Sequence, residues 1–283
     1  MKCSYCIVPK TRGIERSRPM EDIVKEAETL AKSGAKEIQL LGQVVNAYGR
    51  GEMPSSEGKS PFVQLLEKIN KIEGIERVRF VSPHPSFFKE DLIAAYSKLD
   101  KVCEYAHLPL QSGSDRILRE MNRKYDRAGY LATIDLIREQ IPNAGLSSDI
   151  IVGFPTETEE DFEQTLDIVR RVRYNNLFMF LYSKRSGTPA AEMDGQILEE
   201  VKKERITRLI GEQKRIASEL AKECVGKTYE VLCDSRGSMV TGKTQEDRVI
   251  VFDSEGSDLY NEWVTVEVTG TKNSKLYGKM IRK

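Results

Sequence analysis

The sequence predicts an α/β fold in which an open parallel barrel is followed by a small all-β barrel. Through residues 1–220, short apolar segments typical of strands alternate with amphipathic helical segments of about ten to fifteen residues, which indicates right-handed βαβ units and a parallel sheet. After Gly226, short runs rich in β-branched and aromatic residues are separated by Gly, Asp, Ser and Asn, as is typical of a small antiparallel barrel. A chain of 283 residues is long enough to bury one large core and one small one.

The elements of the first part are predicted from their apolar periodicity, in chain order. A helix with one apolar face is expected at 20–33, and a buried strand at 37–42 follows it. The alternation continues with helices at 62–69, 89–97 and 128–140 and with strands at 78–81, 107–110 and 146–152. Thr156 and Glu159 form an expected capping box at the start of the next helix, and a strand at 177–182 closes the series.

The first part ends with a long charged helix, expected at 196–221, whose apolar seam includes Val201, Ile206 and Leu209. This helix looks like a connector that packs across the barrel. The strands of the small barrel are expected at 229–233, 248–252 and 263–268.

Five parallel strands fit an open or partial barrel better than a closed barrel of eight strands, and function in such a sheet belongs at the carboxyl ends of the strands. Each expected strand is followed there by a polar turn segment: 42–43, 82–84, 111–114, 153–155 and 183–189. Any one of these segments would be an ordinary tight turn. Five at one edge indicate a ligand site, because glycine lets a backbone approach a ligand closely.

Cys3 and Cys6 form a Cys-x-x-Cys pair that can offer two thiolates to a soft metal centre. Half a zinc site, a dithiol redox pair and two ordinary cysteines stay open as alternatives. The other three cysteines are scattered, with no His at the ligand spacing of a tetrahedral zinc site. The proline and glycine that follow Cys6 indicate a loop, whereas a thioredoxin-type pair follows a strand and opens a helix.

Charge and composition exclude some classes of function. Lys and Arg number 44, as do Asp and Glu, so no overall attraction to nucleic acid is expected. The opening segment 2–18 is locally basic, and it is either a solvated loop or a phosphate-binding patch. Five cysteines without a regular framework indicate a reducing compartment. No apolar run approaches the length of a membrane span, so we expect a cytoplasmic protein that does not bind membranes.

The opening string CSYCIVPKTRGIERSR (3–18) closely resembles the cluster loop of radical S-adenosylmethionine tRNA methylthiotransferases, the MiaB family. That loop has three cysteines spaced Cys-x3-Cys-x2-Cys, and Cys3 and Cys6 match the second and third. The first would lie two positions before Met1, so we expect the chain to be a fragment or a gene model begun at an internal methionine.

Four later motifs are similar to the strand-end motifs of the same family: LLGQVVNAYG (40–49), HLPLQSGSDRILREMNR (107–123), LSSDIIVGFPTETEEDF (146–162) and YSKRSGTPAA (182–191). One departure is Val44, where the family usually has Asn, and this puts one polar contact near the cofactor in doubt. The resemblance implies a partial TIM-type radical SAM barrel at 1–220, including the connector helix. The segment 221–283 resembles a TRAM domain, a small OB-like barrel that binds RNA.

The resemblance implies that Cys3 and Cys6 hold a [4Fe–4S] cluster whose third ligand is missing from the chain. The open iron of such a cluster binds S-adenosylmethionine, and reduction yields a 5′-deoxyadenosyl radical. Gln43, Ser147 and Asp149 are candidate cofactor contacts, because they are polar side chains in or just after apolar strands, where burial without a partner is costly. No catalytic residue is identified, and a histidine at a strand end, such as His84 or His107, is more often structural than catalytic.

In this family the radical abstracts hydrogen from C2 of adenosine 37 of tRNA, usually N6-isopentenyladenosine beside the anticodon, and a methylthio group is inserted. That group comes from a second [4Fe–4S] cluster in an N-terminal domain that this chain lacks. An electron donor such as flavodoxin or ferredoxin is implied. The alternatives are the related enzyme that acts on threonylcarbamoyladenosine 37 and a catalytically incomplete RNA-binding fragment. The ribosomal-protein methylthiotransferase fits less well, because HLPLQSGS differs from its usual motif.

The expected TRAM domain has ten basic and ten acidic residues, so only local contacts with RNA are predicted. Lys243, Arg248, Lys272 and Lys275 are the residues expected to touch phosphates. The alternative is that this barrel only caps the larger domain. Choice of the base would then lie in the larger barrel, where an adenine must be unstacked to reach the radical.

Overall fold

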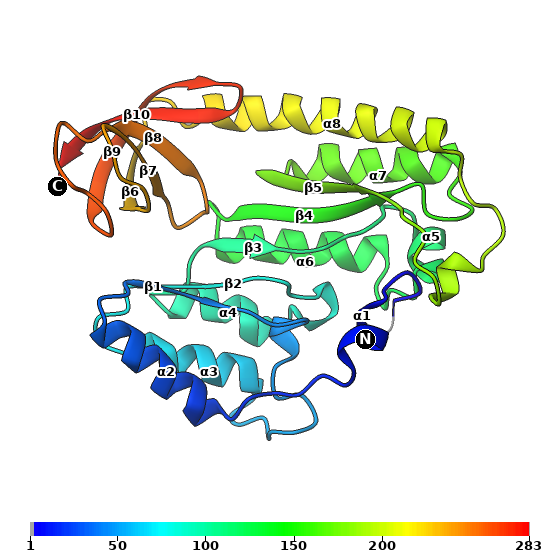
Figure 1. The fold of residues 1–283 in the computed structure, drawn as a ribbon, viewed down its shortest axis with the longest axis horizontal. Coiled ribbons are helices and arrows are strands. Elements are labelled where there is room, and N and C mark those ends of the chain that lie inside the picture. Colours follow the sequence, from blue (N-terminus) through cyan, green and yellow to red (C-terminus); the bar gives the residue numbers. More distant parts are fainter. Residues whose placement is uncertain (1–2, 283) are drawn as a thin grey trace.

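A computed structural model describes residues 3–282 of the chain (Figure 1). Its α-helices are α1 (Val8–Arg12), α2 (Met20–Lys32), α3 (Pro61–Asn70), α4 (Glu90–Lys98), α5 (Asp115–Glu120), α6 (Arg127–Gln140), α7 (Glu159–Val172) and α8 (Glu199–Lys222). Its strands are β1 (Glu37–Leu40), β2 (Arg77–Phe80), β3 (Tyr105–His107), β4 (Gly145–Val152), β5 (Asn176–Leu181), β6 (Thr228–Cys233), β7 (Met239–Lys243), β8 (Val249–Asp253), β9 (Trp263–Lys272) and β10 (Lys275–Arg282).

The first five strands are parallel and follow one another in chain order. β1 pairs with β2, and β3, β4 and β5 form a second sheet in that order. Val78 joins the two sheets, because its N–H donates to Lys101 O at 2.7 Å and its carbonyl accepts from Cys103 N at 3.0 Å. Helices α2, α3 and α4 lie along β1 and β2, and α6, α7 and α8 lie along β3 to β5 (Figure 1). The predicted open α/β barrel is therefore confirmed.

The core of this barrel is built from the apolar faces of the helices and the buried strands. Leu66 and Ile69 of α3 are fully buried, and Phe62 packs edge-on against Phe80 of β2 with ring centroids 5.1 Å apart. Ser60 caps α3 by accepting from Val63 N, which fixes where the helix begins. The helical period of the sequence thus determines which side of each helix faces the sheet.

The capping box of α7 lies two residues after the predicted one. Thr158, not Thr156, is the N-cap, and its partner is Asp161, not Glu159. Thr156 has a φ of 68° and its hydroxyl accepts from Arg116, so it belongs to the preceding turn. Asp161 also accepts from Ser114 Oγ at 2.6 Å, so the box ties α7 to the start of α5. These long-range contacts decide between two capping signals that are nearly equivalent in sequence.

Some elements differ from the predicted set. β3 covers Tyr105–His107 instead of 107–110. Regular pairing with β4 ends there, because Leu110 N donates to the side chain of Ser148 at 3.0 Å and not to a backbone carbonyl of β4. The short helices α1 and α5 and the strands β7 and β10 were not predicted. All except β10 have only six residues or fewer, which is too short for a periodic pattern to stand out.

The last five strands form a closed barrel in the order β10-β8-β7-β6-β9, with its own core that includes Val231, Ile250, Phe252 and Val266. The predicted small barrel is therefore confirmed. It lies at the amino ends of the parallel strands, where a Cβ on Gly145 at the start of β4 would meet Glu246 O. Figure 1 shows the N-terminal segment at the other end of the same strands.

Two buried arginines of β2 attach the small barrel to the large one. Arg77 is 1% exposed, donates to the carbonyls of Lys243 and Glu230, and stacks on the Trp263 ring at 4.2 Å. Arg79 is 5% exposed and donates to the carbonyls of residues 244 and 245. Buried guanidinium groups satisfied mainly by backbone carbonyls of the other barrel fix the two barrels against each other. Over the described part of the chain, no helix is long and apolar enough to cross a membrane.

Candidate functional site

The Cys3–Cys6 segment lies at the carboxyl edge of the parallel strands. Ser4 fixes it there: Ser4 N–H donates to Met121 O at 3.1 Å, its hydroxyl donates to Glu120 O at 2.7 Å, and its carbonyl accepts from Ala190 N at 2.9 Å. Cys6 N–H donates to Cys3 O at 3.2 Å, which closes a turn between the two cysteines. Both thiols are free and partly exposed. The basic residue Lys2 lies outside the described residues.

Arg123, which follows α5, approaches Cys3 from beneath. Arg123 is 9% exposed, and its guanidinium donates to Pro109 O at 3.0 Å, Tyr125 Oη at 2.8 Å and Cys3 Sγ at 3.3 Å. No carboxylate among the described residues pairs with Arg123. Burial raises the pKa of Tyr125 to about 12, so the phenol is neutral at ordinary pH. The third acceptor of this buried cation is the sulfur of Cys3.

The donor set of this edge fits two of the ligands of an iron–sulfur cluster. Thiolates are the usual ligands of such clusters, and Arg123 supplies a compensating charge and a hydrogen bond to one sulfur. Within residues 3–282, no group of three or more His, Cys, Asp or Glu side chains could hold a metal ion. Cys3 and Cys6 are therefore the candidate cluster thiolates that the described residues place at this edge.

Tyr5 stands between Cys3 and Cys6 in the sequence. A cavity of about 310 Å³ lies beside Tyr5 and reaches the ends of β4 and β5. Asp149, Gln111, Phe180 and Arg185 also line it. Burial raises the pKa of Tyr5, whose ring packs edge-on against Phe154. Asp149 is the only acidic side chain in the lining. This cavity extends from the cysteine loop to the inner face of the sheet. A molecule bound at Cys3 and Cys6 would therefore contact both the loop and the sheet.

A series of polar contacts links Tyr105, Ser147, His107 and Asp149. Tyr105 Oη and Ser147 Oγ are 2.5 Å apart, Ser147 Oγ and His107 Nδ1 are 2.7 Å apart, and His107 Nε2 lies 3.4 Å from Asp149 Oδ2. Burial raises the pKa of Tyr105 to about 12, so this phenol is neutral at ordinary pH, and either hydroxyl of the Tyr105–Ser147 pair can be the donor. Ser147, which lies in the middle of this series of contacts, is fully buried and does not line the cavity. Of the predicted cofactor residues, Asp149 therefore faces the cavity and Ser147 lies behind it.

Gln43 lies in a different hollow, a cavity of about 600 Å³ between the opening segment, α2 and the end of β1. Arg12, Arg16 and Arg18 line the same cavity, so the structure brings the basic opening segment and the β1 end together. The three predicted cofactor residues do not share one cavity. The departure at Val44 falls in this second hollow as well.

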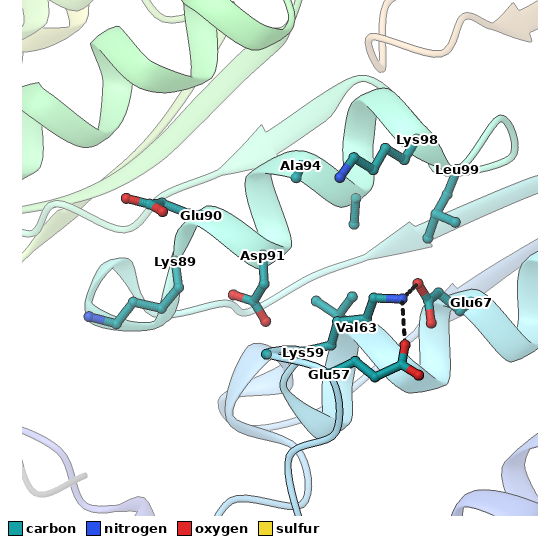
Figure 2. Close-up of a pocket in the computed structure, with 12 residues that line it drawn as sticks. Glu57, Lys59, Val63, Glu67, Lys89, Glu90, Asp91, Ala94, Lys98 and Leu99 are labelled. Carbon is teal, nitrogen blue, oxygen red and sulfur yellow. Dashed lines mark ion pairs between the residues drawn. The ribbon is translucent and has the colours of Figure 1, made fainter.

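Figure 2 shows a third cavity, of about 610 Å³, on the outer side of α3 and α4. Four of its charged side chains are engaged: Lys59 pairs with Glu67 at 2.6 Å and with Glu57 at 4.0 Å, and Asp91 accepts from Ser60 N at 2.8 Å. Lys89, Glu90 and Lys98 also line it. We assign this groove no part in the site, because its lining includes none of the residues at the carboxyl edge of the strands.

The four predicted RNA contacts fall in two places. Lys272 and Lys275 are exposed and directly opposite each other in the β9–β10 hairpin. Lys243 pairs with Asp247 at 3.4 Å and its carbonyl accepts from Arg77, so it lies where the barrels meet. Arg248 lines a groove of about 230 Å³ that also includes Asn176 and Ala217 of the larger domain. Lys275 lines this groove as well, so Lys272, Lys275 and Arg248 lie near one another, and Lys243 lies at the contact between the barrels.

His84 follows β2, near the carboxyl edge of the parallel strands, and is 4% exposed. Its Nδ1 accepts from Ser86 N, so Nε2 carries the proton, and Nε2 has no hydrogen-bond partner in the described structure. Burial, followed by the positive charge of Arg123, lowers the pKa of His84 to about 3. Its neutral ring packs edge-on against Tyr125.

Sequence reasoning did not single out Arg123, Tyr5, Gln111 or Phe180 as site residues. The motif HLPLQSGSDRILREMNR contains two of them and was recognised only as a whole. Gln111 has a φ of 71°, a backbone conformation that residues other than glycine rarely adopt. Nothing in the sequence around Gln111 predicts this conformation.

The fold and the site together define a barrel protein in which a cysteine loop at the carboxyl edge of a parallel sheet faces a ligand cavity. Comparisons with known proteins specify this class. Residues 1–169 match the model of the Radical SAM superfamily, and residues 222–281 match that of the TRAM domain. The chain belongs to the Radical SAM superfamily, and this membership implies S-adenosylmethionine and a [4Fe–4S] cluster.

Curated relatives agree with the resemblance seen in the sequence. The chain is 48% identical over 282 residues to the tRNA-2-methylthio-N(6)-dimethylallyladenosine synthase of Methylacidiphilum infernorum, covering 98% of this chain and 60% of the relative. It is 48% identical to the synthase of the same name from Opitutus terrae, covering 99% of this chain and 59% of the relative. The resemblance to the MiaB family is confirmed. The chain spans about 60% of the length of these relatives.

A solved structure shows the same fold. Coproporphyrinogen III oxidase (HemN) from Escherichia coli, described as a radical SAM enzyme, matches with a TM-score of 0.52 and 13% identity, over 100% of this chain and 69% of that chain. At that identity the likeness concerns the fold alone.

Proposed function

We propose that this chain is the radical SAM and RNA-binding portion of a tRNA methylthiotransferase that adds a 2-methylthio group to N6-isopentenyladenosine at position 37 of tRNA. The observation that carries the proposal is the 48% identity to synthases of that name across nearly the whole chain. The Cys3–Cys6 loop beside a cavity at the carboxyl edge supports it, because that edge is where parallel α/β barrels place their chemistry.

In this proposal Cys3 and Cys6 supply two thiolates to a [4Fe–4S] cluster, and a third thiolate comes from outside the chain described here. When bound, the cluster supplies the single electron that cleaves S-adenosylmethionine. Asp149 binds the cofactor directly, Ser147 holds Asp149 through His107, and Gln43 contacts the cofactor from the neighbouring cavity. A second [4Fe–4S] cluster in a further N-terminal domain provides the methylthio group.

The proposed domains are 1–220 for the radical SAM domain and 221–283 for the TRAM domain. We propose that the TRAM domain binds the anticodon arm of tRNA through phosphates, with Lys272 and Lys275 as its exposed contacts and Lys243 and Arg248 at the junction with the larger barrel. An electron donor such as flavodoxin or ferredoxin reduces the cluster, and the protein works in the cytoplasm.

The test is mass spectrometry of nucleosides from tRNA of a strain lacking the gene, with and without the gene restored. We expect 2-methylthio-N6-isopentenyladenosine to disappear on deletion and to return on restoration. Loss of a methylthiolated threonylcarbamoyladenosine instead would assign the other tRNA substrate. An unchanged nucleoside profile would leave the RNA-binding fragment as the correct reading.

A further inference from the structure

His84 carries a buried N–H group that has no acceptor among the described residues. The residue is 4% exposed, and its Nδ1 accepts from Ser86 N at 3.2 Å, so the proton of the neutral ring lies on Nε2. Nε2 is shielded from solvent and makes no hydrogen bond within residues 3–282. Because a buried donor without an acceptor is costly, this group indicates that a ligand of the site supplies the acceptor.

The position of His84 is fixed by the protein itself. Asn46 Nδ2 donates to His84 O at 3.0 Å, and Asn46 Oδ1 accepts from His84 N at 2.8 Å. The imidazole ring packs against Phe87 and Tyr125, with ring centroids 5.8 and 5.6 Å away. These contacts hold the ring in one orientation, so Nε2 cannot turn to another acceptor without breaking them.

The groups around this ring lead to the cysteine loop. Tyr125 Oη accepts from Arg123 Nε at 2.8 Å and donates to a backbone carbonyl at 2.8 Å, so it is already engaged. Arg123 has only donors, and it gives one of them to Cys3 Sγ at 3.3 Å. His84 follows β2 at the carboxyl edge of the strands, which is the edge where the N-terminal segment lies (Figure 1). A cluster bound at Cys3 and Cys6 brings sulfur acceptors to this side of the edge.

We propose that Nε2–H of His84 donates a hydrogen bond to a sulfur atom of the [4Fe–4S] cluster held at Cys3 and Cys6, and that this bond raises the reduction potential of the cluster. Hydrogen bonds to the sulfurs are one of the factors that set the potential of such clusters. A donor stabilises the reduced cluster more than the oxidised one, because the reduced cluster is more negative. The inference rests on the proposed function, which places the cluster at these two cysteines, and it assigns His84 to uptake of the electron and not to binding of RNA.

The first measurement is the midpoint potential of the cluster in the anaerobically reconstituted chain, with dithiothreitol present to supply the third thiolate. His84→Asn keeps an oxygen that can accept from Ser86 N but loses the distal N–H. We expect the ratio of reduced to oxidised cluster at a given potential to fall about tenfold in this variant, the effect of about one hydrogen bond, which is a shift of about 59 mV to lower potential for a one-electron couple.

Two further variants separate the N–H group from the packing of the ring. His84→Gln gives up the acceptor for Ser86 N but keeps an N–H donor at the reach of Nε2, so its potential should stay close to that of the wild type. Phe87→Leu is the matched control, because it alters the packing against the His84 ring and removes no hydrogen-bond donor. Its potential should be unchanged.

The second measurement detects the contact itself. The chain has two histidines, His84 and His107, so labelling histidine with nitrogen-15 marks two side chains and no others. Pulsed EPR of the reduced cluster without S-adenosylmethionine should show coupling to a labelled nitrogen, and His84→Asn should remove this coupling. The coupling in the wild-type chain needs no substitution, so its absence would overturn the proposal even if a variant failed to fold.

An unchanged potential in His84→Asn would also overturn the proposal, and so would a coupling that persists in that variant, because His107 would then be the residue beside the cluster. Equal shifts in His84→Asn and Phe87→Leu would show that packing, and not the N–H group, affects the potential. Failure of the wild-type chain to hold a cluster would contradict the proposed function at Cys3 and Cys6 and this inference with it. A stable cluster whose potential does not respond to His84→Asn contradicts the role of His84 alone.

Discussion

The guanidinium of Arg123 donates to the sulfur of Cys3 at 3.3 Å, although the two residues are 120 positions apart. Arg123 is buried, and its other two donors are fixed by Pro109 O and Tyr125 Oη. Its position is therefore set by the barrel and not by the cysteine loop. We infer that the barrel presents a fixed cation to which one thiolate of the loop must fit.

Replacing Arg123 should weaken iron binding at this edge. Groups that hydrogen-bond to metal ligands typically contribute 10- to 100-fold to metal affinity, so Arg123→Gln should lose iron about tenfold more readily. The measurement is iron retained per chain after anaerobic reconstitution and exposure to a chelator. Arg119→Gln, an exposed change on α5, the helix that precedes Arg123, is the control and should behave as wild type. Equal iron retention in both variants would show that the Arg123–Cys3 contact does not support the metal.

The three predicted cofactor residues should differ in their effect on S-adenosylmethionine binding. Asp149→Asn should weaken it most, because Asp149 lines the cavity beside the cysteine loop. Ser147→Ala should weaken it less, since it acts only through His107. Gln43→Ala should have the smallest effect, because Gln43 lies in the adjoining cavity. Calorimetric titration of the reconstituted protein checks the order, and a Gln43 effect larger than that of Asp149 would reverse our placement of the cofactor.

Acid should destabilise the protein through His84. Burial lowers its pKa from 6.5 to about 3, so between these values the unfolded chain binds a proton that the folded chain does not. The stability that depends on neutral His84 is complete above pH 6.5 and is lost as the pH falls, with a slope of about 1.4 kcal/mol per pH unit. His84→Asn does not titrate and its side-chain oxygen can still accept from Ser86 N. Urea unfolding from pH 7 to 4 should therefore show a shallower loss for the variant, and parallel curves would refute the role of His84.

The contact between the barrels should depend on Arg77. Arg77→Ala leaves the carbonyls of Lys243 and Glu230 without their donor and removes the stacking on Trp263, at a cost of about 2–4 kcal/mol. Denaturant unfolding measures this loss. Arg236→Ala is a control, because Arg236 also stacks on an aromatic ring, Tyr260, but is exposed. A loss of similar size in both variants would mean that burial of Arg77 contributes nothing.

The hairpin lysines should contribute to tRNA binding without reading sequence. Lys272→Gln with Lys275→Gln removes two exposed charges that face each other across β9 and β10. Affinity for different tRNAs should fall uniformly, and the slope of log K against log salt should decrease by roughly 1.5 to 2. Lys243→Gln should change the slope less, because its ammonium already pairs with Asp247. Filter binding at several salt concentrations tests both expectations, and a larger effect of Lys243 would place the RNA at the junction of the barrels instead.

The sequence by itself determined the order of the longer helices and of the five parallel strands, the two barrels and the cysteine pair. Each depends on local signals: the spacing of apolar residues such as Leu66 and Ile69, the turn residues between strands, and the short distance from Cys3 to Cys6. Where two local signals competed, as for the capping box of α7, the sequence favoured Thr156, and contacts with residues 114 and 116 decided for Thr158.

Only the tertiary structure decided which side chains meet. It put Arg123 against Cys3, placed Ser147 behind Asp149 through His107, and left Gln43 in another cavity. It also turned Lys243 toward the larger barrel and Phe180 toward the cavity. The physical reason is that these contacts join residues dozens to more than a hundred positions apart. Whether such residues touch depends on strand register and barrel closure, which no local stretch of sequence encodes.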